Sequence, residues 1–273
     1  MHLAALHIHP VKSLRGLTVQ SAAVDPLGAV GDRRFLVVDP AGNFLTQRTV
    51  PRMALVGALL DDSTLTLRSE GFGEIRVRRA SDPDARIVSV RVWSSEGLQA
   101  EDCGDGPASW LGNALGTPGR LVRLGPAFNR LVTPERARPG DVVGFADGYP
   151  FLVVGDGSLR DLNRRIGESG AGPVPMNRFR PNLVLAGCEP YAEDSWRRFR
   201  IGAVVFRAAG PCSRCIITTT DQATGARGIE PLRTLARYRR STEEPTLVNF
   251  GQNLVHEVKS GRLSVGDPVE ILD

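Results

Sequence analysis

The sequence predicts a mainly β protein that carries only a few α-helices. Short apolar and β-branched segments alternate with polar residues, and clusters of Gly, Pro, Asp and Asn separate these segments. Few stretches show the periodicity of a helix. The chain has 273 residues, of which 41% are hydrophobic, so it can bury a sizeable core in one large domain or in two of ordinary size.

The first part of the chain is rich in strand patterns. Residues 35–39 and 43–47 flank a Pro-Ala-Gly turn, which predicts a hairpin. Alternating segments downstream predict further strands at residues 63–69, 74–78 and 88–93. The first helical pattern spans residues 106–116 and ends at a glycine. We therefore expect a compact β domain over residues 1–120.

The second half returns to strands after a loop at residues 125–141, which is rich in Pro, Gly and charge. Apolar segments predict strands at residues 151–155, 182–187, 203–210 and 246–250. A helix is expected to start at Ser158, whose hydroxyl would serve as the N-cap. A second helix is expected over residues 231–240, with proline in its first turn. We expect residues 121–273 to form the second domain.

Charge and composition exclude several classes of protein. The net charge is only +4, and basic residues occur in short pairs rather than in a stripe with aromatics, so we expect no nucleic-acid partner. The N-terminus lacks the pattern of a secretory signal, and no apolar run is long enough to span a bilayer. These features predict a cytoplasmic protein without a membrane partner, whose four cysteines stay reduced.

Cys212 and Cys215 form a CxxC motif around Arg214, and a neighbouring cation favours the thiolate form that binds soft metals. A structural zinc site is disfavoured, because it needs about four ligands and there is no second CxxC. A thioredoxin-like pair is disfavoured too, because residues 215–221 are β-branched and predict a strand entering a turn. Two interpretations stay open: a pair of half-buried thiols without a function, and one thiolate that binds a soft metal together with non-protein sulfur ligands.

Cationic residues beside predicted strands suggest an anion site. Lys12 and Ser13 lie on a turn after a short apolar strand, where they could bind an anion. A solvated lysine in a loop would give the same pattern. Arg33 and Arg34 precede a strand whose alternation would turn one of them inward, where it needs an anionic partner. A third group opens the strand at residues 182–187 and consists of Arg178, Arg180 and Asn182. Pairing with Asp or Glu would explain each arginine alone, but several inward cations beside a reactive thiol indicate an anionic, sulfur-containing cofactor.

These residues lie in blocks that resemble the MOSC family, the molybdenum cofactor sulfurase C-terminal domains. The blocks cover nearly the whole chain in the family's order and read PVKSLRG, GDRRFLVVDPAGNFLTQRTVPRMALV, PFLVVGDGSLRDLN, NRFRPNLVLAGCEPYAEDSW, CSRCIITTTD, FGQNLV and VGDPV. The resemblance is strongest to the mitochondrial amidoxime-reducing components and their bacterial relatives. It implies a MOSC N-terminal β-barrel-like domain over residues 1–120 and a cofactor-ligating MOSC β-barrel domain over residues 121–273.

The resemblance implies a pyranopterin molybdenum cofactor, whose dithiolene sulfurs and Cys215 hold the metal. Cys188 matches a family cysteine that is not a ligand, and the role of Cys212 is left open. The positions that match cofactor-contacting residues of the family are Lys12, Ser13, Arg33, Asp147, Gly148, Tyr149, Arg180 and Asn182. Gly148 and Tyr149 replace the small hydroxyl residues of eukaryotic relatives, which leaves their backbone N–H groups for the phosphate.

By the same resemblance, the protein is an oxidoreductase that reduces N-hydroxylated compounds, namely amidoximes, hydroxylamines and N-hydroxylated bases, to amines. Asp221 is a catalytic candidate for proton delivery, although a carboxylate at this position more often starts a turn. We expect a monomer that receives electrons from a separate protein, such as a ferredoxin, a flavodoxin or a cytochrome b5-like chain. The alternatives are a sulfur carrier with a persulfide on Cys215 and a non-catalytic domain that stores the cofactor.

Overall fold

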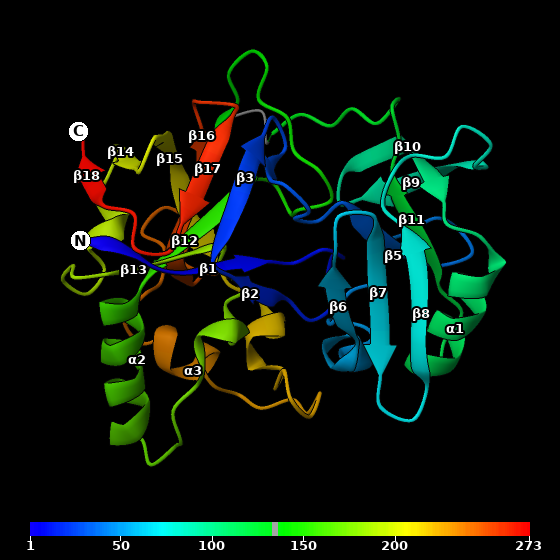
Figure 1. Ribbon diagram of the computed structural model, residues 1–273. Coiled ribbons are helices and arrows are strands. Elements are labelled where there is room, and N and C mark those ends of the chain that lie inside the picture. The colour runs from blue at the N-terminus through cyan, green and yellow to red at the C-terminus, as the bar shows by residue number, and fades with distance from the viewer. Residues whose placement is uncertain (133–135) are drawn as a thin grey trace.

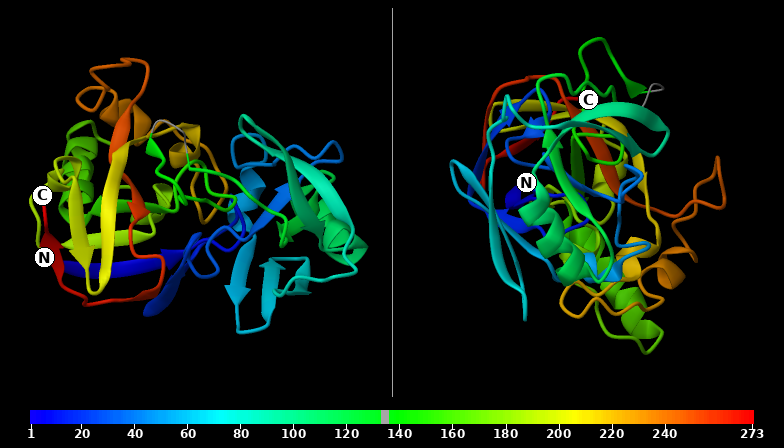
Figure 2. Two further views of the ribbon diagram at one scale, coloured as in Figure 1. Left: turned by 90° about the horizontal axis from the view of Figure 1, so that it is seen from above. Right: turned by 90° about the vertical axis from the view of Figure 1, so that its right-hand side faces the viewer.

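The computed structural model describes residues 1–132 and 136–273 and consists of two lobes built mostly from strands (Figure 1). The larger lobe (residues 1–29 and 142–273) holds an eight-stranded sheet, two helices and both chain ends. The smaller lobe (residues 35–124) holds two sheets and one helix, and it stands beside the larger lobe in Figure 1 and in the left view of Figure 2. The prediction of a mainly β protein with few α-helices is confirmed.

The sheet of the larger lobe has the strand order β18-β14-β15-β16-β12-β13-β1-β2. Its strands are β18 (Val269–Ile271), β14 (Arg198–Ile201), β15 (Val204–Ser213), β16 (Asn249–His256), β12 (Phe151–Gly155), β13 (Leu183–Ala186), β1 (His2–Ile8) and β2 (Leu17–Val19). Strands β12 and β13 pair in parallel, and helix α2 (Asp156–Glu168) makes the crossover between them. The short helix α3 (Leu232–Leu235) follows later in the chain. The residues just before β13 therefore lie at one end of a buried parallel pair.

A three-stranded sheet accompanies the large sheet and consists of β17 (Gly261–Ser264), β3 (Ser21–Asp25) and β4 (Gly28–Ala29). Both β1 and β3 thus pair with strands from the C-terminal half, since β1 pairs with β13 and β3 with β17. The first 29 residues consequently belong to the sheets of the larger lobe. The boundary expected at residue 120 stays a prediction.

The smaller lobe contains one sheet of order β5-β11-β10-β9 and one of order β6-β7-β8. Its strands are β5 (Phe35–Val38), β6 (Gly57–Leu60), β7 (Thr64–Ser69), β8 (Gly73–Arg78), β9 (Ile87–Val92), β10 (Ser95–Asp102) and β11 (Arg120–Leu124). Helix α1 (Asp105–Leu115) ends at Gly116, whose φ of 71° and N–H bond to the Gly112 carbonyl form a left-handed C-cap. Short 3₁₀-helices connect elements at η1 (Pro51–Leu55), η3 (Met176–Arg178), η4 (Ala192–Asp194) and η5 (Ile216–Thr219).

Two predicted strands are wrong. Residues 43–47 make only isolated bridges, because Phe44 pairs with Val38 while Asn43 pairs with Arg91, and the chain then turns at Thr46. Residues 216–219 form η5 instead of a strand. In η5 the hydroxyl of Thr218 donates to the Cys215 carbonyl at 2.9 Å. Such local side-chain bonds compete with strand pairing, and they override the β-branched composition.

Two predicted helix features are corrected as well. Helix α2 begins at Asp156, so Ser158 lies in its first turn and is not the N-cap. The Ser158 hydroxyl instead donates to the buried carboxylate of Glu193, at 2.8 Å. The helix predicted over residues 231–240 is reduced to α3, and turns continue from its end.

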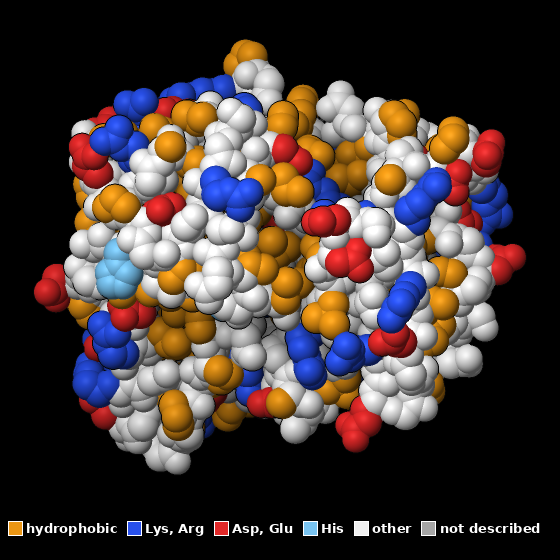
Figure 3. Space-filling view, viewed as in Figure 1, with side chains coloured by type: hydrophobic (Ala, Val, Ile, Leu, Met, Phe, Trp, Pro, Cys, Tyr) orange, Lys and Arg blue, Asp and Glu red, His pale blue; other side chains and the backbone are white. Residues whose placement is uncertain are grey.

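In the described residues no helix has the length and apolar character needed to cross a membrane. Basic and acidic side chains are interspersed over the face in Figure 3.

Candidate functional site

A cavity of about 140 Å³ lies at the junction of the two lobes. The smaller lobe contributes Thr46, Arg48 and Trp93 to its wall, and the remaining wall belongs mostly to the larger lobe. The wall contains nearly all of the residues predicted for the site: Lys12, Ser13, Arg33, Asp147, Gly148, Tyr149, Arg180, Asn182 and Cys215. Segments that are far apart in sequence thus meet at one cavity, and Asp221 is the predicted residue that does not line it.

The backbone is strained around this cavity. Five non-glycine residues of the described chain have a positive φ, and four of them line the cavity: Ser13 (66°), Arg33 (45°), Trp93 (55°) and Arg180 (54°). The left-handed region is unfavourable for residues with a Cβ, and such residues gather where the fold over-determines their conformation for a function. The strain is an independent sign that this cavity is the functional site.

Cys215 and Cys212 have different surroundings. Cys215 caps η5 at the cavity, and Arg48 Nε donates to its Sγ at 3.3 Å. Cys212 packs against the apolar cluster under β12 and β16, and its Sγ accepts a bond from Arg214 Nη1 at 2.8 Å. Burial raises the pKa of Cys212, although Arg214 opposes this shift. The two thiols are therefore not equivalent, and Cys215 is the one that faces a cation of the other lobe.

Arg33 is fixed by buried polar contacts. Its Nη1 donates to Asp32 Oδ2 at 2.6 Å and to Asn182 Oδ1 at 3.0 Å. Asn182 Oδ1 also accepts the N–H of Leu152, and Asn182 Nδ2 donates to the His7 carbonyl at 3.2 Å. Asn182 thereby ties β12, β1 and Arg33 together and is 1% exposed. Its amide positions Arg33 rather than standing free for a ligand.

The alternation expected at the start of β5 is wrong. Arg33 and Arg34 have side chains that are 14% and 15% exposed, so both are largely buried. The positive φ of Arg33 interrupts the extended backbone that alternation requires. Arg34 turns away and pairs with Asp25 at 2.7 Å.

A chain of contacts runs along the cavity wall from Lys12 to Arg48 of the smaller lobe. Lys12 is 6% exposed and forms an ion pair with Asp147. Asp147 Oδ1 also accepts the indole N–H of Trp93 at 3.0 Å. The guanidinium of Arg48 lies 4.3 Å from the centre of the Trp93 ring. Burial lowers the pKa of Lys12, and Asp147 limits this decrease. Lys12, Asp147, Trp93 and Arg48 therefore form one connected wall.

The cavity has more cations than carboxylates. Its wall contains the basic residues Lys12, Arg33, Arg48, Arg178, Arg180 and Arg214. Carboxylate partners exist for three of them, in the pairs Lys12–Asp147, Arg33–Asp32 and Arg178–Asp221. The others, Arg48, Arg180 and Arg214, have no ion pair within residues 1–132 and 136–273. Arg180 and Arg214 each bury one guanidinium nitrogen, and a desolvated cation without a partner is costly, so their part of the wall fits an anionic ligand.

Buried nitrogens without hydrogen-bond partners lead to the same conclusion. Among the described residues, Arg178 Nε, Arg180 Nη2 and Arg214 Nε have no acceptor. Desolvation, followed by repulsion from Arg33, lowers the pKa of Arg180 to about 9. An anionic group in the cavity would supply the missing acceptors and offset the repulsion. The residues present therefore fit the phosphate and sulfur chemistry of the cofactor expected from the sequence.

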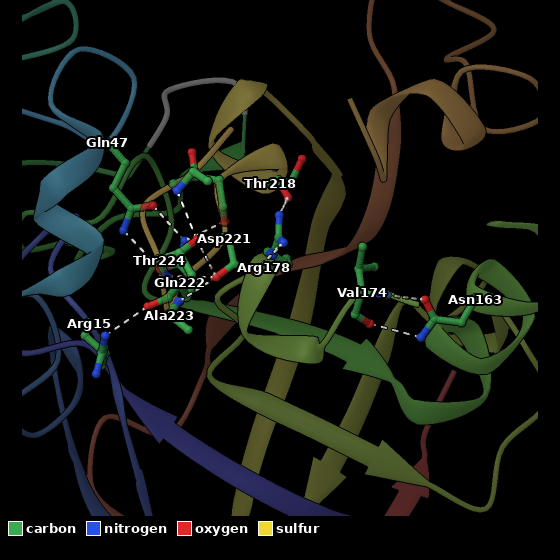
Figure 4. A network of polar contacts seen from close by, with 12 residues as sticks. Arg15, Gln47, Asn163, Val174, Arg178, Thr218, Asp221, Gln222, Ala223 and Thr224 are labelled. Atoms are coloured by element: carbon green, nitrogen blue, oxygen red, sulfur yellow. Dashed lines mark hydrogen bonds and ion pairs between the residues drawn. The ribbon is translucent and has the colours of Figure 1, made fainter. Parts of the chain in front are cut away.

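Asp221 does not line the cavity, and its partners are two residues of its own turn and Arg178 of the cavity wall (Figure 4). Its Oδ1 accepts the N–H groups of Ala223 and Thr224, each at 2.9 Å, and its Oδ2 accepts a bond from Arg178 at 2.8 Å. The backbone N–H bonds of Thr224 and Ala223 lower the pKa of Asp221. This geometry is that of a carboxylate that starts a turn and anchors Arg178.

The sequence analysis did not single out Arg48 or Trp93. Arg48 lies in a block that matches the family, but it directly follows residues 43–47, which were wrongly predicted to form a strand. The positive φ of Trp93 has no signature in the sequence. Within the described part of the chain, no cluster of three or more His, Cys, Asp and Glu side chains is placed to hold a metal ion. The arginine that touches Cys215 could be found only from the spatial arrangement of the lobes.

The chain matches known proteins over nearly its whole length. Residues 1–118 match the family model of the MOSC N-terminal beta barrel domain, and residues 140–270 match that of the MOSC domain. The chain is 36% identical to human mitochondrial amidoxime-reducing component 1, over 99% of this chain and 82% of that protein. It is 31% identical to the human component 2, over 98% of this chain and 82% of that protein. The chain therefore belongs to the MOSC family, and the mitochondrial amidoxime-reducing components are among its relatives.

Proposed function

We propose that the protein is a molybdenum-cofactor-dependent oxidoreductase that reduces N-hydroxylated compounds, such as amidoximes, hydroxylamines and N-hydroxylated bases, to amines. The observation that carries the proposal is a cavity in which Arg180 and Arg214 have no ion pair and lie near the half-buried thiol of Cys215. Soft thiolates bind metals of this type, and arginines bind phosphate. The names of the relatives supply the substrate class.

Each residue of the site has a role in this proposal. Cys215 would bind the metal through its thiolate, and Lys12, Ser13, Arg33 and Arg180 would hold the anionic part of the cofactor. The backbone N–H groups of residues 147–149 lie on the same wall and would complete the phosphate site. Asn182 would act indirectly, because its amide holds Arg33 in place.

The reaction has a simple balance. The N–O bond of the substrate breaks, its oxygen leaves as water, and two electrons and two protons are consumed. The bound cofactor would supply the two-electron redox chemistry. Although burial opposes the shift, the pair with Lys12 holds the pKa of Asp147 well below its usual range, so Asp147 stays a carboxylate and keeps Lys12 in place. Asp221, the proton-delivery candidate from the sequence, is poorly placed for this role, because the turn occupies its Oδ1 and Arg178 occupies its Oδ2.

The electrons would come from a separate protein, such as a ferredoxin, a flavodoxin or a cytochrome b5-like chain. The word component in the relatives' names agrees with such a division of labour. A monomer and a cytoplasmic location stay predictions, and the named relatives are mitochondrial.

The decisive experiment compares the wild type with Cys215→Ala after expression in a host that makes the cofactor. The wild type should purify with stoichiometric molybdenum and pterin and should convert benzamidoxime to benzamidine with a chemical reductant. Cys215→Ala should lose the metal or at least about 100-fold in turnover, because a direct ligand is removed. Cys188→Ala is the matched control, because Cys188 is also half-buried but does not line the cavity.

Other outcomes would point to the alternatives. Labile sulfur on Cys215 without molybdenum would favour the sulfur carrier, and bound cofactor without turnover under any donor would favour storage. Correctly folded wild-type protein that takes up no metal in this host would contradict the proposed function.

A further inference from the structure

Arg48 reaches Cys215 from the other lobe and is held there from three directions. Its Nε donates to Cys215 Sγ at 3.3 Å, and its guanidinium lies over the Trp93 ring at 4.3 Å. Arg227 of the larger lobe donates to the backbone oxygens of Gln47, at 2.9 Å, and of Arg48. The turn that carries Arg48 is therefore fixed to the larger lobe, and the guanidinium stays next to the sulfur.

The charge of Arg48 is offset only in part, through its charge interaction with Asp147. In the described chain it has no ion-pair partner, and the carboxylate on the cavity wall, Asp147, already pairs with Lys12. Arg48 also stands apart from the positions assigned to the cofactor, which lie on the larger lobe and at Arg33. Its positive charge consequently remains at the thiol where the proposed reaction would take place.

The proposed substrate and product differ in charge. An amidoxime is a weak base and is neutral near pH 7, because the electronegative oxygen withdraws electron density from the nitrogens. The amidine formed from it is a strong base and takes up a proton to become a cation. A molecule bound beside Cys215 would lie well within the Debye length of about 8 Å from Arg48. Arg48 would therefore repel the product and leave the substrate nearly unaffected.

We propose that Arg48 is a specificity-determining residue that admits the neutral N-hydroxylated base and expels the protonated amidine. This inference rests on the proposed function and adds to it a substrate class, neutral bases, together with a cause for product release. Trp93 would serve as the platform that keeps the guanidinium directed toward Cys215.

The test measures two ligands on molybdenum-loaded protein. Benzamidine is titrated by calorimetry and used as an inhibitor, while benzamidoxime gives the KM for turnover. In Arg48→Gln, benzamidine should bind about tenfold more tightly, which corresponds to ~1.4 kcal/mol. The KM for benzamidoxime should change less than about threefold, because a neutral ligand feels little of the charge. In the wild type, added salt should also strengthen benzamidine binding, because it screens the repulsion between Arg48 and the cation.

Two further variants make the result specific. Arg48→Lys keeps the charge and should retain the weak benzamidine binding of the wild type. Arg52→Gln removes a cation that lies 5.9 Å from the Phe72 ring beside a different cavity. It should change neither the affinity for benzamidine nor the KM for benzamidoxime. Equal effects of Arg48→Gln on both ligands, or unchanged benzamidine binding, would overturn the inference while leaving the proposed function intact. Loaded wild-type protein that does not turn over benzamidoxime would instead overturn the proposed function and this inference with it.

Discussion

Arg180 has the properties of a residue that binds an anionic ligand in the cavity. It precedes β13 in a left-handed conformation with φ 54°, and its Nη2 is buried without an acceptor. Desolvation and the charge of Arg33 lower its pKa to about 9. A side chain in this state costs stability unless an anion binds, because neither its charge nor its donor is compensated.

We predict opposite effects of Arg180→Met on the two forms of the protein. Without cofactor, the variant should gain about 1 kcal/mol in the free energy of unfolding, because an unpaired buried cation is removed. When it is expressed in a host that makes the cofactor, the variant should contain much less molybdenum and pterin than the wild type. Urea denaturation and metal analysis would measure the two effects.

The control for this prediction is Arg160→Met on α2. Arg160 is exposed and, within the described residues, pairs only with Asp156, four residues earlier, so its change should stay within about 0.5 kcal/mol. A cofactor-free Arg180→Met protein that is less stable than the wild type would show that Arg180 supports the fold and is not reserved for a ligand.

At the scale of elements, α2 is anchored at the start of the only parallel crossover of the described sheets. Glu193 in η4 is 1% exposed, and it accepts bonds from Gly155 N at 3.0 Å and from Ser158 Oγ at 2.8 Å. The Ser158 hydroxyl also accepts the N–H of Tyr191 at 2.8 Å. A carboxylate at a helix N-terminus is favourable, and here it fixes α2 against the end of β12.

Glu193→Ala should lower the free energy of unfolding by about 2–3 kcal/mol, because it leaves two buried donors unsatisfied. Glu189→Ala, an exposed neighbour in the same loop, should change it by less than about 0.5 kcal/mol. Urea denaturation monitored by circular dichroism would provide both values. Equal stability of the two variants would mean that water replaces the carboxylate at the start of α2.

Element prediction succeeded where one face of a segment decides its structure. Strands β7 and β8, and helix α1, follow the patterns of alternation and spacing that were read from the sequence. The segment after Cys215 was misassigned because Thr218 and Thr219 bond back to the preceding carbonyls and close a 3₁₀ turn. Side-chain bonds of this kind are invisible to hydrophobic periodicity.

At the scale of the whole molecule, a buried pair of amides joins the lobes beside the site. Gln47 Nε2 donates to Gln222 Oε1 at 3.1 Å, and Gln222 Nε2 donates to Gln47 Oε1 at 2.9 Å. Gln47 also donates to the Ser13 carbonyl at 2.8 Å, so the turn after Lys12 is tied to the same pair. These contacts fix the relative position of the lobes at the point where the cavity needs residues from both.

The stability of the whole molecule should depend on His256. This residue is fully buried at the end of β16, and its Nε2 contacts the Asp25 carbonyl of β3 at 2.7 Å. Burial lowers its pKa to about 4, from about 6.5 in an unfolded chain. As the pH falls through this window, the unfolded chain binds the proton first, so the free energy of unfolding decreases.

Between pH 7 and pH 4.5, His256 should account for about 2–3 kcal/mol of this decrease. His256→Gln should therefore show a shallower pH dependence in urea denaturation, although it is less stable at pH 7. His2→Gln, an exposed histidine at the chain end, should keep the wild-type slope. An unchanged slope in His256→Gln would mean that other groups cause the acid sensitivity.

Pattern and resemblance were sufficient for the fold class, the family and most of the cavity wall, from Lys12 to Cys215. These features depend on local periodicity and on short motifs, and both are visible along the linear sequence. The pairing of Arg48 with Cys215 and the excess of unpaired arginines were apparent only in the folded molecule. Burial and charge balance are properties of residues that folding brings together, and the contact between Arg48 and Cys215 spans 167 positions of the chain.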